Sequence, residues 1–121
     1  MLTLPPSVQI WLATEPVDLR KGFDGLTAIV RHQWQKDPFA GHLFVFLGKR
    51  RDRCKILLWD RGGLVIYYKR LERGRFRVSR VRDDATHVRM DATELAMLLD
   101  GIDFGRVHRA RHWEPPARKT A

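Results

Sequence analysis

The sequence predicts an α+β domain, in which an antiparallel sheet of about five strands, partly a meander, carries two helices packed on it. Short apolar runs separated by glycine-rich or charged turns predict the strands, and two apolar stripes with helical spacing predict the helices. The chain has 121 residues, 44% of them hydrophobic, which suffices for one buried core. We therefore expect a single domain over residues 1–105, followed by a basic tail, 106–121, that stays loosely ordered unless a partner holds it.

The first half of the chain predicts strand, helix and strand in that order. Residues 8–13 predict a strand with Val8, Ile10 and Leu12 on one face, and Pro16 ends the run. The next apolar residues are spaced three, four and four apart and predict one stripe of a helix: Phe23, Leu26, Val30 and Trp34. Residues 43–47 are apolar at every position, which is typical of a central strand covered on both faces.

The next segment predicts a hairpin that completes a three-stranded meander. Residues 55–59 and 64–68 are strand-like runs, and the turn at 61–63 contains two glycines. Residues 75–78 and 80–82 alternate too, but their phase slips at residue 79. If the slip is a bulge, arginines 75, 77, 80 and 82 share one solvent-facing side, whereas two separate strands would not assure this.

The last predicted elements are a short strand and a helix. Val88 and Met90 indicate the strand. Asp91 and Glu94 have the spacing of a capping box, so we expect the helix to begin there. Its apolar stripe consists of Leu95, Leu98, Leu99 and Ile102, and Gly101 is a natural C-terminal stop.

The net charge of +9 is concentrated in the middle of the chain. Residues 49–89 hold 14 basic and 5 acidic residues, residues 90–105 have a net charge of −4, and residues 106–121 have +4. This segregation favours an anionic partner bound by one face. The alternative is a solvated basic surface that merely keeps the protein soluble.

The residues that catalysis or metal binding needs are sparse. Cys54, the single cysteine, excludes an intramolecular disulfide and a thiolate metal cluster, and we expect it in the core. The sequence lacks a phosphate loop and a zinc signature, and the pair His108 and His112 lies in the basic tail. A metal-dependent nuclease needs clustered carboxylates, and nothing brings together three of the candidates, Asp18, Asp24, Asp37 and Asp60. We expect no enzyme activity, no cofactor and no metal.

Binding to nucleic acid is the function that the basic residues favour, because arginine forks fit phosphate oxygens. Two clusters, each beside a predicted hairpin, form the candidate site: Lys49, Arg50, Arg51 and Arg53, and Lys69, Arg70, Arg73, Arg75 and Arg77. Tyr67, Tyr68 and Phe76 lie among them and could stack on bases. We expect Phe76 and one of the two tyrosines in the core instead, because adjacent strand residues face opposite ways.

The chain shows no feature of secretion or membrane insertion. The N-terminus lacks the basic and apolar regions of a signal peptide, and no apolar run approaches the ~20 residues of a membrane span. We therefore expect a cytoplasmic protein.

Four blocks of this sequence resemble one known family. They are residues 11–14 with 18–26 (WLAT, DLRKGFDGL), 37–46 (DPFAGHLFVF), 69–76 (KRLERGRF) and 98–103 (LLDGID). In this order they are similar to the small accessory proteins called TnpB in insertion sequences of family 66. The chain departs from the family where Arg77-Val78-Ser79 stands in place of a tryptophan-proline pair, and where Phe104 replaces a frequent tryptophan.

The resemblance implies a role in DNA transposition beside a separate, larger transposase that carries the catalytic carboxylates. It supplies no catalytic residues. Three functional hypotheses follow. In the first, the protein binds DNA at the element ends through its basic hairpins. In the second, it docks on the transposase or another accessory subunit, and the acidic segment 90–105 is either the docking surface or simply a capped helix on the sheet. In the third, it is a nuclease-like enzyme.

Overall fold

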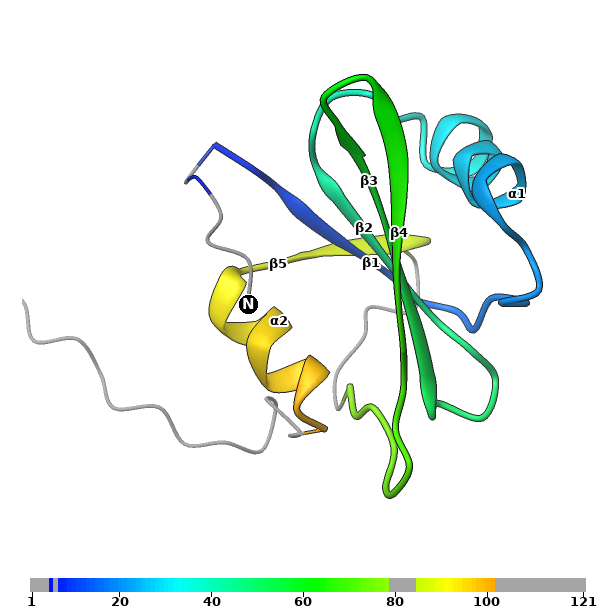
Figure 1. Ribbon diagram of the computed structural model, residues 1–121, viewed down its shortest axis with the longest axis vertical. Coiled ribbons are helices and arrows are strands. Elements are labelled where there is room, and N and C mark those ends of the chain that lie inside the picture. Colours follow the sequence, from blue (N-terminus) through cyan, green and yellow to red (C-terminus); the bar gives the residue numbers. More distant parts are fainter. Residues whose placement is uncertain (1–4, 6, 79–84, 102–121) are drawn as a thin grey trace, which may run out of the picture.

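The computed structural model describes residues 5, 7–78 and 85–101, and this part of the chain forms one mixed sheet with a helix on each face (Figure 1). The strand order is β4-β3-β2-β1-β5. The strands are β1 (Ile10–Ala13), β2 (Leu43–Leu47), β3 (Arg53–Asp60), β4 (Gly63–Arg70) and β5 (His87–Met90), and the helices are α1 (Phe23–Ala28) and α2 (Ala92–Leu99). The predicted α+β class is confirmed.

The sheet departs from the purely antiparallel prediction at one pair of strands. β1 and β2 run parallel, with Ile10 opposite Leu43, whereas the other three neighbouring pairs are antiparallel. The reason is the connection: α1 lies between the two strands in sequence, and a helical crossover returns the chain in the same direction. The meander of β2, β3 and β4 is confirmed.

Each face of the sheet has its own hydrophobic cluster. On the α2 face, Ile10, Leu12 and Val45 pack with Leu95 and Leu98 of the helix. On the α1 face, the cluster joins Ala13, Phe44, Phe46 and Leu57 to Leu26, Ile29, Val30 and Trp34. β2 is buried along its whole length, as the sequence predicts for a central strand.

The first helix is short and continues without a break into a π-helical turn, η1 (Ile29–Gln33). The backbone N–H of Trp34 donates to the carbonyl of Ile29, five residues earlier, at 3.1 Å. Trp34 is buried, as predicted, but Phe23 is 47% exposed. The predicted stripe is wrong at Phe23 because the helix begins at that residue, so its buried face starts with Leu26.

The predicted hairpin turn and the predicted ends of α2 are confirmed. Arg61 and Gly62, with φ values of 42° and 88°, form the two-residue loop between β3 and β4. Asp91 caps α2: the Glu94 N–H donates to the Asp91 carboxylate at 2.7 Å, and the Asp91 N–H donates to the Glu94 carboxylate at 3.0 Å. Gly101 follows the helix with φ of 76°.

The strand predicted at 75–78 is wrong. These residues adopt no regular structure, although Phe76 is completely buried in the cluster on the α2 face. A buried Phe76 between two exposed arginines produces the alternation of apolar and polar residues that is typical of a strand, although the segment is irregular. Arg80, Arg82, Ile102 and the tail 106–121 lie outside the described residues.

Candidate nucleic-acid interface

The two basic clusters predicted from the sequence meet at one end of the sheet, the lower end in Figure 1. The loop 48–52 joins β2 to β3, and the segment 71–78 follows β4. Two backbone hydrogen bonds connect these loops: the Leu71 N–H donates to the Asp52 carbonyl at 2.7 Å, and the Phe76 N–H donates to the Arg51 carbonyl at 2.6 Å. We call this region, residues 48–53 with 70–78, the basic end.

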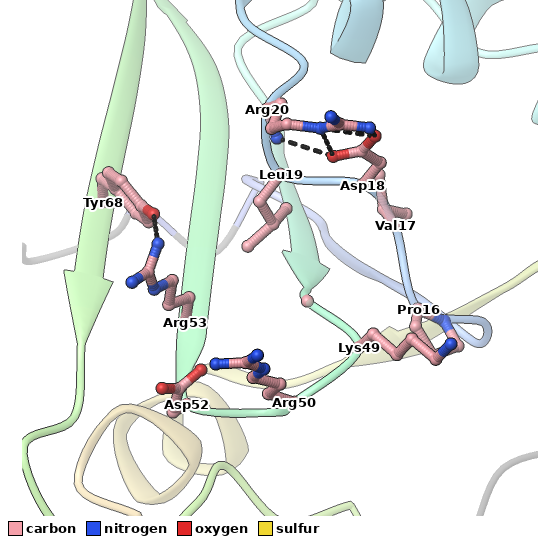
Figure 2. A pocket seen from close by; sticks show the side chains of 11 residues that line it. Pro16, Val17, Asp18, Leu19, Arg20, Lys49, Arg50, Asp52, Arg53 and Tyr68 are labelled. Atoms are coloured by element: carbon pink, nitrogen blue, oxygen red, sulfur yellow. Dashed lines mark hydrogen bonds and ion pairs between the residues drawn. The ribbon is translucent and has the colours of Figure 1, made fainter.

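A cleft of about 890 Å³ opens beside the basic end (Figure 2). The segment 16–20 lines it on one side, and the loop 48–50, Asp52, Arg53 and Tyr68 line it on the other. Two contacts hold the first side in place. The Val17 N–H donates to the Leu47 carbonyl at 2.9 Å, and the Leu19 side chain packs against Gly48. The lining carries four basic side chains, Arg20, Lys49, Arg50 and Arg53, and two acidic ones, Asp18 and Asp52.

Asp18 and Arg20 form an ion pair at the mouth of this cleft, visible at the top of Figure 2. The Arg20 guanidinium donates through Nε and Nη2 to both carboxylate oxygens, at 2.7–3.1 Å. The side-chain hydrogen bond from Arg20 lowers the pKa of Asp18 to about 2. Arg20 keeps 92% of its side chain exposed, so the carboxylate orients the guanidinium without removing it from solvent.

A second ion pair borders a smaller hollow that Tyr68 also lines. The Arg70 guanidinium donates to the Glu72 carboxylate at 2.8 and 3.2 Å, and this hydrogen bond raises the pKa of Arg70. Arg53, Tyr68, Arg70 and Glu72 line this hollow of about 380 Å³. Arg53 and Tyr68 line both hollows, so the two hollows adjoin at these residues.

Among the nine predicted binding residues, the side chain of Lys69 makes a structural contact, and the backbone of Arg51 does so. The Lys69 ammonium lies on the opposite face of β4 from Arg70 and donates to the Leu99 carbonyl at 2.6 Å, at the C-terminal end of α2. Arg51 is half-buried with φ of 61°, and its carbonyl accepts the hydrogen bond that anchors Phe76. It does not line the cleft.

The other predicted residues present their charges to solvent. Lys49 and Arg50 on the first loop are exposed, as are Arg73, Arg75 and Arg77 on the second. None of these five side chains makes a hydrogen bond or an ion pair with another residue in the described ranges. As far as the described residues go, these side chains can therefore bind an anion without breaking a hydrogen bond or an ion pair.

The expectation that one tyrosine lies in the core is wrong. Tyr67 is 43% exposed and Tyr68 is 50% exposed. β4 is an edge strand, so neither of its faces is completely covered there, although the two tyrosines do face opposite ways. Phe76 is in the core, as expected.

Sequence reasoning missed two residues of the site. Arg20 lines the cleft, but it lies in residues 1–48, where the basic and acidic residues balance. Lys55 lies in a strand, as the sequence predicts, but its side chain has a further role that the sequence pattern does not indicate. Its ammonium donates to the carbonyls of Leu19 and Lys21, at 2.7 and 3.1 Å, and thereby ties β3 to the cleft wall.

The described residues contain no group of three or more histidine, cysteine or carboxylate side chains placed to hold a metal ion. Of the carboxylates considered above, Asp18 pairs with Arg20, and Asp37 accepts a hydrogen bond from the Phe39 N–H at 2.9 Å. His108 and His112 lie outside the described residues. No helix in residues 5, 7–78 and 85–101 is long and apolar enough to cross a membrane.

Comparison with known proteins assigns the family. The family described as IS66 Orf2-like protein matches residues 8–109. The chain belongs to this family. Among its relatives in Sinorhizobium fredii, the uncharacterized protein y4jC is 41% identical over 102 residues, 84% of this chain and 86% of the relative. The uncharacterized protein y4hO is 34% identical over 115 residues, 95% and 96% of the two chains. No solved structure matches significantly.

Two of the four sequence blocks that carry the resemblance to the IS66 Orf2-like family border the cleft and its neighbouring hollow. The block 18–26 contributes the Asp18–Arg20 pair, and the block 69–76 contributes Arg70 and Glu72. The block 98–103 meets the third block on the other face, where Leu99 accepts the hydrogen bond from Lys69. This IS66 Orf2-like chain thus brings blocks that are distant in sequence to one end of its sheet.

Proposed function

We propose that this IS66 Orf2-like protein is a non-enzymatic accessory factor in DNA transposition that binds DNA through the basic end of its sheet. The family fits an accessory role in transposition. The observation that carries the DNA-binding part is the joining of two basic loops by the hydrogen bonds from Leu71 and Phe76. Two clusters about 20 residues apart in sequence become one cationic surface in this way.

Free, exposed cations are the groups that a DNA backbone attracts most strongly. Arginine forks bind phosphate oxygens with two hydrogen bonds, and each phosphate that they neutralise releases a condensed counterion. The five exposed cations of the basic end, at positions 49, 50, 73, 75 and 77, neutralise about five phosphates if all engage. Binding therefore depends steeply on salt, and sequence preference is not required.

The acidic segment gives the docking hypothesis less support than the basic end gives DNA binding. Leu95 and Leu98, the centre of the apolar stripe of α2, are buried against the sheet. The stripe is therefore already used in covering one face of this domain. We infer that a transposase, where it binds, meets another surface.

A salt titration with a labelled duplex tests the proposal. Fluorescence anisotropy should give a slope of log K against log salt of about −4.5, which corresponds to about a 500-fold loss of affinity between 50 and 200 mM salt. Replacing Arg73 and Arg75 with alanine should reduce the slope to about −2.7, because two phosphate contacts are lost.

The matched control is the double variant Arg61→Ala and Arg89→Ala. Both residues are exposed arginines, Arg61 in the turn at the opposite end of the β3–β4 hairpin and Arg89 on β5. The control should retain the wild-type slope. Equal slopes for both double variants, or no binding at low salt, would reject the basic end as the site.

The non-enzymatic part has its own test. Purified protein with magnesium or manganese should neither nick nor join DNA. Cleavage that is lost on replacing Asp18, Asp24 or Asp60 with asparagine would show that the carboxylates are catalytic and would overturn this part of the proposal.

A further inference from the structure

Tyr68 is an exposed aromatic ring fixed among cations. It lies opposite Lys55 in the β3–β4 pair, and the Lys55 ammonium sits 4.8 Å from the ring centroid. Since Lys55 is itself held by the carbonyls of Leu19 and Lys21, the ring has a fixed support on that side. The Tyr68 hydroxyl accepts a hydrogen bond from the Arg53 guanidinium at 3.4 Å, drawn in Figure 2. Half of the residue remains exposed.

The two hollows that this ring lines suit a flexible strand better than a duplex. Arg53 and Tyr68 line both the cleft of about 890 Å³ and the hollow of about 380 Å³, so the two adjoin at the ring. Their linings include the arginines 20, 50, 53 and 70 and three carboxylates, of which Asp18 pairs with Arg20 and Glu72 with Arg70, while Asp52 is the third. In a duplex the bases are stacked inside, out of reach of a side chain in a hollow, whereas a single strand can present a base to the ring and phosphates to the arginines.

We propose that this cleft binds single-stranded DNA, with one base stacked on Tyr68 and the neighbouring phosphates on Arg53 and Arg50. The inference rests on the proposed function, since both use the basic end, but it assigns a different ligand form and a specific residue. Base stacking on an aromatic side chain tolerates any sequence, because every base has a π-face. The site therefore selects unpaired DNA rather than a particular sequence.

Tyr67 provides a matched control within the same strand. It is the neighbouring residue, of the same type and similar exposure, at 43% against 50%. It pairs with Ile56, whose side chain belongs to the cluster on the α2 face, so it points away from the cleft. A general effect of removing an exposed tyrosine from β4 would appear equally in both variants.

The experiment measures anisotropy with a labelled 12-nucleotide oligo-dT strand and with a duplex, both at 50 mM salt. Tyr68→Ala should bind oligo-dT about 5- to 150-fold more weakly than wild type, because one stacked base is lost. Tyr68→Phe should stay within about twofold, since the ring remains. Tyr67→Ala should match wild type, and duplex affinity should be unchanged in all three variants.

A stacking readout makes the assignment specific. One 2-aminopurine placed in the strand should lose fluorescence on binding to wild type and to Tyr68→Phe, but not to Tyr68→Ala. If Tyr68→Ala binds oligo-dT as tightly as Tyr67→Ala does, while the duplex is still bound with a steep salt dependence, the single-strand site is rejected and the proposed function stands. If wild type binds neither DNA, both are rejected.

Discussion

Lys69 and Arg70 are neighbours with the same charge, but the structure gives them opposite roles. The Lys69 ammonium donates to the Leu99 carbonyl at the end of α2, at 2.6 Å. Arg70 lies on the other face, beside the cleft, and its pair with Glu72 leaves 56% and 78% of the two side chains exposed. Lys69 should therefore affect stability, and Arg70 should affect binding.

Replacing Lys69 with methionine keeps the length of the side chain and removes the charge. A hydrogen bond from a charged group contributes about 1.5–3 kcal/mol, and a cation near a helix C-terminus contributes about 0.3–1 kcal/mol. Because Lys69 is only half-buried, we expect a loss of about 1–2 kcal/mol in the free energy of unfolding, or about 4–8 °C in Tm. Arg70→Met should leave the free energy of unfolding close to the wild-type value, because exposed ion pairs contribute little.

Urea unfolding and DNA anisotropy on the same two variants separate the roles. Lys69→Met should unfold at lower urea and keep the wild-type salt slope. Arg70→Met should unfold like wild type and bind single-stranded DNA more weakly, because Arg70 lines the hollow beside Tyr68. The reasoning is refuted if Lys69→Met keeps wild-type stability while its salt slope falls by about 0.9, the effect of one lost phosphate contact.

Three further predictions concern single groups. Phe76→Ala should lower the free energy of unfolding by about 3–5 kcal/mol in a urea titration, because the ring is completely buried, and a loss below about 1 kcal/mol would contradict its role as an anchor. Cys54, whose pKa is raised to about 12 by burial, should not react with a thiol reagent at pH 8 until the protein is unfolded, and rapid reaction in the native state would contradict its burial. The Asp18 carboxyl should titrate near pH 2 in NMR, because Arg20 lowers its pKa from 3.8. The Asp18–Arg20 pair thus stabilises the fold above about pH 4 and is lost as the pH falls through about 2, whereas a midpoint near 4 would mean that the pair is absent in solution.

The sequence predicted the elements whose signal is local. Apolar runs predicted β2 and the β3–β4 hairpin, and the spacing of Asp91 and Glu94 predicted the start of α2. Phe76 could be assigned to the core but not to an irregular segment, because a single buried ring and a strand produce the same local pattern. The parallel pairing of β1 with β2 depends on which strands become neighbours, which no local pattern encodes.

The candidate site was predictable in composition but not in arrangement. Clustered arginines pointed to the basic end, yet the separation of Lys69 from Arg70 depends on which face of β4 each side chain occupies. Arg20 was not predicted to belong to the site, because its position at the cleft depends on tertiary contacts. Val17 hydrogen-bonds to Leu47, and Leu19 packs against Gly48. Such contacts join segments about 30 residues apart, and no periodic pattern of apolar residues in the sequence indicates them.

Mapping DNA onto the protein by NMR tests the central claim most directly. Adding a short duplex at low salt to ¹⁵N-labelled protein should shift the amide and arginine side-chain resonances of residues 49–53 and 70–77. The amides of the turn at 61–63 should remain in place, since this turn lies at the opposite end of the β3–β4 hairpin. Shifts confined to α2, or no shifts at low salt, would contradict the account.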